Sequence, residues 1–354
     1  MIAWHKEYTS LAGKTILVTG ATGLIGSNLI NALMQIQGAM VIATSRSLTK
    51  LQSLFKQYQD QENFFIYEHD VYHPFDFSEF NIDYLFHAAG PQEKAVIENY
   101  PMQVINANIE GTLNCLNFLR VQKEKKNIQG RLILFSSVTV YGNNSSKDVE
   151  LTENDTSVTL DLRHPAVVYS ESKRISEVLC RSYCKEDPVS FVVARLSTVY
   201  GNCFYKTDTA FFEFIQKALA HENIKVKNSL LARRDNIYVD DAVSGLLTIA
   251  LKGEEMGAYN ISSNGNQDSF LAIDEIAQLI ADVANEVINS KSKITVEVLG
   301  DKFLNQVRAP GIRLNNNKLR RLGWDMKTDI RSGIEKTIKS CLSQRRSNNF
   351  VNRS

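Results

Sequence analysis

A tyrosine and a lysine four residues apart are the side chains in this sequence with the clearest capacity for acid–base chemistry. Tyr169 and Lys173 lie within residues 165–185, whose pattern predicts a helix, and residues four apart share one helix face. An isolated tyrosine titrates at about pH 10, and a nearby ammonium favours its phenolate. Lowering the pKa of Tyr169 by ~3 units requires on the order of 4 kcal/mol, which two close cations in a cleft can supply. The alternative is a tyrosine–lysine pair on a solvated helix face.

A glycine-rich turn near the start of the chain is typical of phosphate binding. It follows the β-branched run 15–19 and precedes a helical pattern. Glycines here allow a tight turn, let backbone amides approach a pyrophosphate and let the helix pack close to the sheet. The alternative is a plain strand–helix turn, but strand, helix and composition together predict a dinucleotide-binding turn. Its candidate contacts are Gly20, Gly23, Leu24, Ile25 and Gly26.

A serine lies where a later buried strand is expected to end. Ser137 follows the apolar run 131–135, and an active-site group of a doubly wound sheet is expected at such a strand end. Its hydroxyl could instead satisfy the backbone at the end of the strand. The adjacent Ser136 is the other candidate for the same role.

The elements that must position these groups form an alternating pattern. Short apolar runs alternate with helical stretches up to residue 196, and a last run follows at 258–261. This alternation predicts an α/β fold, a doubly wound parallel (Rossmann-like) sheet with a smaller mixed α/β lobe. The expected division is a dinucleotide-binding domain at 1–202 and 236–262, a substrate-binding lobe at 203–235 and 263–345, and a polar tail at 346–354.

Composition limits the partners of the chain. The 354 residues carry 40 Lys and Arg against 39 Asp and Glu, a formal net charge of +1, which argues against a nucleic-acid partner. No signal peptide or run of about 18 apolar residues is present, so no membrane partner is expected. The 5 cysteines form no C-x-x-C pair and are expected as reduced thiols of a cytoplasmic protein. The histidines show no metal-ligand spacing, and no metal is expected.

Several segments, in chain order, resemble motifs of the extended short-chain dehydrogenase/reductase superfamily, and specifically its NAD(P)-dependent nucleotide-sugar epimerase/dehydratase family. The glycine spacing is G-x-x-G-x-x-G, and the last matching motif is a Leu-Gly-Trp segment at 322–324. The resemblance covers about residues 14–340, and the order of the motifs is far more specific than any one of them. The other matching segments are 69–71, 86–90, 108–112, 135–142, 169–173, 195–201 and 234–241.

The resemblance implies roles for individual residues. Its register selects Ser137 over Ser136 and makes Ser137, Tyr169 and Lys173 the catalytic residues. Cofactor-binding residues implied besides the glycine turn are Ser45, Arg46, Asp70, Val71, Ala88, Ala89, Gly90, Asn108, Tyr169, Lys173, Leu196 and Val199. Those implied for a nucleotide-diphosphate sugar are Ser137, Thr198, Arg234 and Arg308, since arginine forks match diphosphate oxygens. Arg308 and the neighbouring Arg233 could instead be ordinary surface charges.

The end of the second apolar run bears on the choice of dinucleotide. Family members that prefer NAD carry an acid there, which accepts the ribose 2′-hydroxyl, whereas this chain has Ser45, followed by Arg46. A carboxylate would repel a 2′-phosphate, whereas a serine and a guanidinium would bind it. NADP(H) is therefore the expected cofactor, and NAD(H) is the alternative if Arg46 only stacks on the adenine.

The two positions after Ser137 separate the subtypes of the family. Its 4,6-dehydratases have an Asp-Glu pair there and its uronic-acid decarboxylases a glutamate at the second position, but this chain has Val138 and Thr139. Neither can act as an acid or base, and Glu171 should point away from Tyr169. A nucleotide-sugar 4-epimerase is therefore expected, although residues 165–185 otherwise resemble the decarboxylases. The alternative is an NADPH-dependent 4-ketoreductase; a dehydratase, a decarboxylase, a reductase of non-sugar carbonyls or a non-catalytic dinucleotide-binding protein fits less well.

The resemblance also implies a homodimer. The helices expected at 99–119 and 165–185 would pair with their copies across a two-fold axis. The sequence adds only that both helices carry more apolar positions than one buried face requires.

Overall fold

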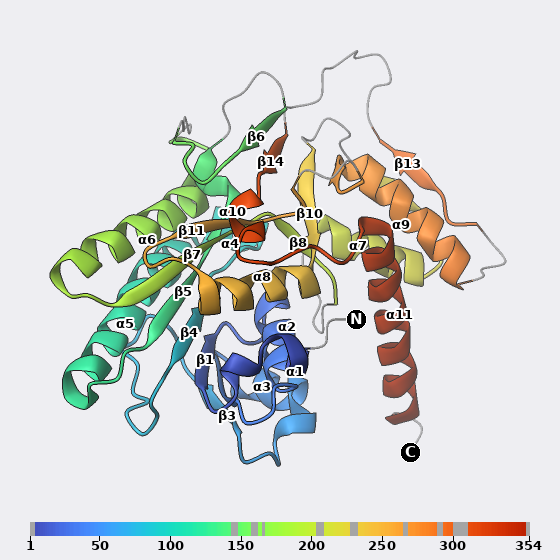
Figure 1. Ribbon diagram of the computed structural model, residues 1–354. Helices are drawn as coiled ribbons and strands as arrows, with labels where there is room; N and C mark the ends of the chain where they lie inside the picture. The colour runs from blue at the N-terminus through green and yellow to red at the C-terminus, as the bar shows by residue number, and fades with distance from the viewer. Residues whose placement is uncertain are drawn as a thin grey trace.

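Seven parallel strands form the central sheet among the described residues, in the order β11 (Ala258–Ile261), β7 (Ser190–Leu196), β5 (Arg131–Ser137), β4 (Tyr84–His87), β1 (Thr15–Thr19), β2 (Met40–Ser45) and β3 (Phe64–Glu68) (Figure 1). The structure is a computed structural model that describes residues 4–142, 148–156, 162–164, 167–202, 209–226, 233–264, 268–288, 293–299 and 311–351. Every neighbouring pair of these strands is parallel. The expected doubly wound α/β fold is confirmed.

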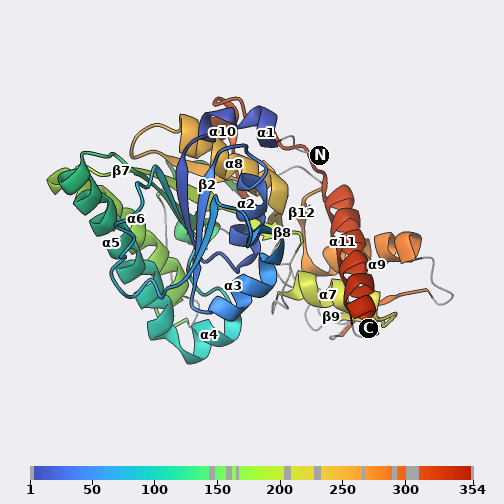
Figure 2. The same cartoon turned by 90° about the horizontal axis from the view of Figure 1, so that it is seen from below.

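The core lies on both faces of this sheet, because successive side chains of a strand point to opposite faces. Ile16 and Val18 of β1 pack on one face with α2 (Leu24–Leu33), α3 (Leu48–Leu54) and α8 (Val239–Lys252). Leu17 between them packs on the other face with α5 (Pro101–Lys126) and α6 (Val167–Glu186). Figure 2 shows these helices as two layers on opposite sides of the strands. Burial on both faces explains why the strand sequences are continuous apolar runs.

A second sheet contains β12 (Phe270–Leu271), β10 (Arg234–Tyr238), β14 (Ile312–Leu314), β6 (Val149–Leu151) and β8 (Thr198–Tyr200), the last of which pairs with β10. A separate parallel pair consists of β13 (Val296–Val298) and β9 (Ile224–Val226). Three helices pack against one another on this side of the molecule, α7 (Ala210–Leu219), α9 (Ile273–Ile288) and α11 (Ile330–Val351) (Figure 1).

The expected division of the chain into two lobes does not coincide with the division of its strands into two sheets. The division therefore stays a proposal. β6 and β8 fall within the expected dinucleotide-binding segment 1–202, yet both pair in the second sheet. The late apolar run 258–261 forms β11, which lies beside β7 in the central sheet. The segment 346–354, expected as a tail, is helical as far as Val351, where α11 ends.

The remaining described elements are short. They are α1 (Trp4–Glu7), η1 (Thr9–Leu11), η2 (Lys56–Tyr58), α4 (Lys94–Asn99), η3 (Val138–Tyr141) and α10 (Asn317–Arg320). Within the described ranges, no helix combines the length and the apolar character that a bilayer crossing requires.

Candidate active site

The glycine turn between β1 and α2 packs against the end of β4. Gly20 has a φ of 63°, a left-handed conformation that favours glycine. A Cβ on Gly20 would lie 2.7 Å from the Ala89 nitrogen and 2.8 Å from the Ala88 carbonyl carbon. A Cβ on Gly26 would collide with the Gly20 carbonyl oxygen. The turn thus requires glycine at both positions, so that it can pack against the segment after β4 and so that α2 can begin close to β1, as in a dinucleotide-binding turn. The other candidates of this turn lie at the start of α2 and are Gly23, Leu24 and Ile25.

Helix α6 and strand β5 bring the three candidate catalytic side chains together. Tyr169 and Lys173 are both buried on α6, and Ser137 is the last residue of β5. The Lys173 Nζ donates a hydrogen bond of 2.8 Å to the Phe135 carbonyl oxygen and lies 5.9 Å from the centre of the Tyr169 ring. Lys173 is only 4% exposed, so this pair does not lie on a solvated helix face.

Burial has the largest effect on the pKa of both Tyr169 and Lys173. It raises the pKa of Tyr169 to about 12, while a hydrogen bond with Ser137 acts in the opposite direction. It lowers the pKa of Lys173 to about 8, while the charge of Glu177 acts in the opposite direction. Lys173 alone therefore does not give Tyr169 the lowered pKa expected from the sequence, and a second cation is required.

Asn108 of α5 reaches the same cluster from the neighbouring helix. Its Nδ2 donates a hydrogen bond of 2.8 Å to the Ser172 Oγ, and its buried Oδ1 has no partner within the described part of the chain. A Cβ on Gly90, after β4, would lie 2.8 Å from this Oδ1 and 3.3 Å from the Lys173 Nζ. Gly90 thus lies against an available acceptor and a buried ammonium, which are groups that can bind a polar ligand.

A buried histidine beside the glycine turn belongs to the site, although we did not predict it as a site residue. The His87 Nδ1 lies 2.9 Å from the Thr19 Oγ1, which also accepts a hydrogen bond of 3.2 Å from the Ala89 nitrogen. Burial, followed by the charge of Lys173, lowers the pKa of His87 to about 3. The imidazole is therefore neutral at physiological pH and links the ends of β1 and β4. Its signal in the sequence was a histidine in an otherwise apolar strand.

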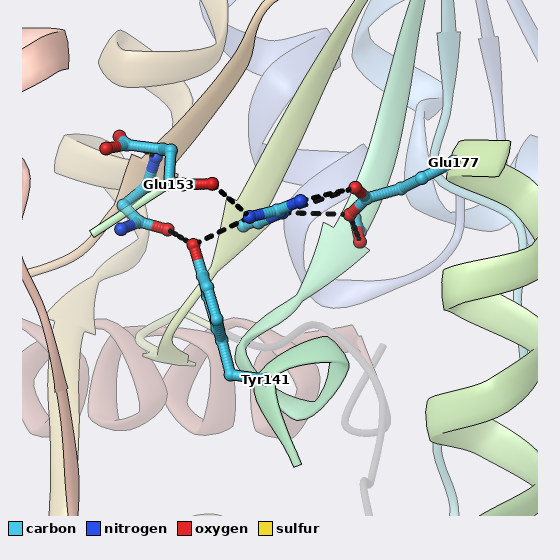
Figure 3. Close-up of polar contacts among 6 residues, drawn as sticks. Tyr141, Glu153 and Glu177 are labelled. Atoms are coloured by element: carbon cyan, nitrogen blue, oxygen red, sulfur yellow. Dashed lines mark hydrogen bonds and ion pairs between the residues drawn. The ribbon is translucent and has the colours of Figure 1, made fainter. Parts of the chain in front are cut away.

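A buried ion pair between α6 and β7 is formed by residues close in sequence to the candidate catalytic residues, and Figure 3 shows its contacts. The Arg195 Nη2 of β7 lies 2.7 Å from the Glu177 Oε2 of α6. The Ser136 hydroxyl donates a hydrogen bond of 2.5 Å to the Glu177 Oε1. Because Ser136 precedes Ser137 and Glu177 follows Lys173 by about one helical turn, the pair joins β5, β7 and α6 next to the candidate catalytic residues.

The same arginine is held from its other side as well. The Arg195 Nη1 donates hydrogen bonds of 2.9 Å to the Tyr141 hydroxyl and 3.1 Å to the Glu153 carbonyl oxygen. Figure 3 shows Tyr141 and Glu153 across from Glu177. The Tyr141 hydroxyl donates in turn to the Asn260 Oδ1 of β11 at 2.8 Å. We missed this network in the sequence; its signal is an acid on the lysine's helix and an arginine on an apolar strand, since buried charges occur in pairs.

The residues expected at the adenine end lie after β2 and β3. Ser45 is buried, and its hydroxyl donates a hydrogen bond of 3.1 Å to the Ser47 carbonyl oxygen. Arg46 beside it is exposed. Asp70 is half-buried and Val71 is buried in the segment that follows β3. These four candidates therefore lie at, or just beyond, the carboxyl ends of two neighbouring strands, β2 and β3.

Two expected cofactor residues, Leu196 and Val199, and the expected substrate residues Thr198 and Arg234 lie in or next to the second sheet. Leu196 ends β7 and is buried, and Thr198 and Val199 form β8, which pairs with β10. Arg234 begins β10 with an exposed side chain. Among the described residues, no hydrogen bond or ion pair links Arg234 to the catalytic cluster. Arg308 lies outside the described residues.

The acidic side chains nearest in sequence to Tyr169 and Lys173 already form ion pairs with arginines. Val138 and Thr139 follow Ser137 and supply no acid. Glu171 forms an ion pair with the arginine three residues on, at 3.0 Å, and Glu177 is held as described. The two positions that carry acids in the dehydratase and decarboxylase patterns therefore offer no carboxylate here, and Glu171 and Glu177 are both held in ion pairs.

Comparison with known proteins agrees with this fold. The model of the NAD dependent epimerase/dehydratase family matches residues 16–262, and the chain belongs to that family. It is 30% identical to UDP-glucuronic acid decarboxylase 1 of Danio rerio, over 92% of this chain and 72% of that protein. The family modifies nucleotide sugars and depends on NAD.

Two solved structures show how widely the fold is shared. UDP-glucuronic acid 4-epimerase of Bacillus cereus, in complex with UDP-glucuronic acid and NAD, has a TM-score of 0.73 at 21% identity and covers 93% of this chain and 99% of its own. dTDP-glucose 4,6-dehydratase of Bacillus anthracis, in complex with NAD, has a TM-score of 0.73 at 19% identity and covers 94% and 98%. These similarities establish the fold and leave the reaction open.

The buried ion pair predicts a large loss of stability on Arg195→Met. This change leaves Glu177, whose side chain is 8% exposed, buried without its cation, which costs about 3–5 kcal/mol. Arg174→Met breaks the more exposed pair with Glu171 and should cost at most ~1 kcal/mol. Urea unfolding of both variants measures the difference. Equal losses would show that the buried pair has no special role.

Proposed function

We propose that this protein is a 4-epimerase of nucleotide-diphosphate sugars. The observation that supports this most is the buried cluster of Ser137, Tyr169 and Lys173 beside the glycine turn, followed by Val138 and Thr139 rather than acids. Such a cluster can remove and return one proton at a sugar hydroxyl, but it lacks the acid–base pair that elimination of water requires. Oxidation at C4 followed by reduction on the other ring face needs only these groups and a hydride carrier.

The proposed roles follow from the chemistry of each side chain. Tyr169 takes the proton of the C4 hydroxyl during oxidation and returns a proton during reduction. Ser137 donates a hydrogen bond to the reacting oxygen. Lys173 binds the nicotinamide ribose and favours the phenolate. The proposed substrate contacts are Ser137, Thr198, Arg234 and Arg308, with the two arginines at the diphosphate.

The residues present fit a dinucleotide. The turn at Gly20 admits no Cβ, and the Asn108 Oδ1 has no partner among the described residues. When bound, NAD(P) supplies a hydride acceptor and then a hydride donor. The expected preference for NADP(H) now depends on the exposed Arg46, because the Ser45 hydroxyl bonds within its own turn. The two solved structures described above hold NAD, and we propose NAD(H) for this chain.

The second candidate function is a nucleotide-sugar 4-ketoreductase. Arg46 favours it, because NADPH is the usual reductant and a guanidinium can bind a 2′-phosphate. A decarboxylase, such as the Danio rerio relative, or a 4,6-dehydratase would need an acid where this chain has Thr139. A non-catalytic protein would have no use for a buried Tyr169 and Lys173.

A homodimer is the assembly that we propose. α5 and α6 pack against each other, and both carry exposed apolar side chains, including Met102 and Val178 at 61% each and Ile175 at 46%. An apolar surface that spans two adjacent helices is typical of an interface between subunits.

We also propose a cytoplasmic location. Cys115, Cys180 and Cys184 are free thiols, as a reducing compartment maintains them. The net charge of +1 offers no basis for a nucleic-acid partner, so the main partner is the small-molecule substrate.

Tyr169→Phe should lower turnover of a nucleotide-sugar substrate by about 10²-fold or more, because it removes the group that moves the proton. The dissociation constant of the dinucleotide should change little. Tyr183→Phe is the matched control, since Tyr183 lies on the same helix but bonds Arg120 and Asn117. NMR of the sugar products and calorimetric titration of the dinucleotide measure the two effects.

The products separate the candidates. A C4 epimer with no net use of the dinucleotide is the expected result, whereas one NADPH consumed per product indicates a reductase. Wild-type turnover by Tyr169→Phe would refute the proposed roles, and loss of water from C6 would establish a dehydratase.

The proposed interface predicts that the wild-type protein sediments as a dimer at micromolar concentration. Val178→Glu together with Ile175→Glu should give a monomer, because charges would be buried in an apolar contact. Met256→Glu, at an exposed apolar position on another part of the surface, should leave the dimer intact. A monomeric wild type would contradict the proposed interface.

A further inference from the structure

Glu68, the last residue of β3, lies beside the end of β2, where this fold holds the adenosine ribose of a dinucleotide. The register of the two strands pairs Ser45 with Glu68, and the His69 nitrogen donates a hydrogen bond of 2.9 Å to the Ser45 carbonyl oxygen. The Glu68 Oε2 accepts a hydrogen bond of 2.9 Å from the Leu48 nitrogen. The carboxylate of β3 therefore reaches the turn that follows β2.

Four donors of this turn already bond to protein oxygens. The Ser45 hydroxyl donates to the Ser47 carbonyl oxygen at 3.1 Å, and the Ser47 nitrogen donates to the Ser45 Oγ at 3.3 Å. The Lys50 nitrogen donates to the Ser47 Oγ at 3.3 Å. With the Leu48 nitrogen held by Glu68, a 2′-phosphate would have to displace these bonds and lie next to a carboxylate.

We propose that Glu68 selects NAD over NADP in this protein, an inference that rests on the dinucleotide site of the proposed function. An ionised carboxylate accepts hydrogen bonds and donates none, so it can bind a ribose 2′-hydroxyl and repels a 2′-phosphate. In NAD-preferring relatives an acid at the end of the second strand does this. Here that strand ends in Ser45, and the neighbouring strand supplies the acid at the same edge of the sheet.

Arg46 acts against this selection but is held less firmly. Its side chain is exposed, and it forms no ion pair within the parts of the chain that the structure describes. Burial raises the pKa of Tyr72, and the charge of Arg46 opposes that rise. Glu68 is exposed as well, but its carboxylate is held by the hydrogen bond from the Leu48 nitrogen, and a fixed charge loses less entropy on binding than a flexible one.

Calorimetric titration of NAD and NADP into the wild-type protein and Glu68→Gln tests the inference. The wild type should bind NAD about tenfold more tightly than NADP, and Glu68→Gln should raise the affinity for NADP by about tenfold. Glutamine keeps an oxygen for the Leu48 amide, so the variant removes the charge and preserves the turn. Glu62→Gln is the matched control, because Glu62 is an exposed residue that precedes the start of β3, and it should leave both affinities unchanged.

The outcomes separate this inference from the proposed function. If neither dinucleotide binds the wild type, the proposed function fails, and the inference fails with it. If both bind, but NADP binds at least as tightly as NAD, only the inference is overturned. It is likewise overturned if Glu68→Gln leaves the ratio of the two affinities unchanged.

Discussion

The arrangement of the candidate site depends on the burial of the Lys173 ammonium group. Its hydrogen bond of 2.8 Å to the Phe135 carbonyl oxygen joins α6 to β5 two residues before the strand ends at Ser137. That contact places Tyr169, one helical turn earlier, beside the same strand end. Burial is costly for a cation, and the lowered pKa of about 8 reflects that cost. The surroundings must therefore compensate for it.

The negative charge of Glu177, one helical turn after Lys173 on α6, offsets part of the cost of burying the ammonium group. Glu177 is itself paired with Arg195, and Arg195 donates hydrogen bonds to the Tyr141 hydroxyl and the Glu153 carbonyl oxygen. The network joins β5, β7, α6 and, through Asn260, β11. Catalytic groups on rigid elements keep their geometry better than groups on loops. The burial that makes the site rigid also raises the pKa of Tyr169 to about 12, so the protein alone keeps this tyrosine protonated.

Much of the fold was predictable, because its signals are local or periodic. β1, β2, β5 and β7 are buried on both faces, so each of them is visible in the sequence as an apolar run. The turn after β1 has no room for a Cβ at Gly20, so it is visible as a glycine motif. The second sheet was not predictable, since β6, β8 and β10 are short and pair across long stretches of chain. The candidate triad was found from spacing and resemblance. The contacts of Glu177, Arg195 and Glu68 depend on strands that are neighbours only in space, and no spacing along the chain indicates them.

The proposed reaction is reversal of the configuration at C4 of a nucleotide sugar by the buried cluster on α6 and β5. UDP-glucose and UDP-glucuronic acid that carry deuterium at C4 test it, with the products analysed by NMR and mass spectrometry. We expect one of them to yield its C4 epimer with deuterium retained at C4 and with no net change in the dinucleotide. Products that have lost water or carbon dioxide, or sugars left unchanged at C4, would contradict it.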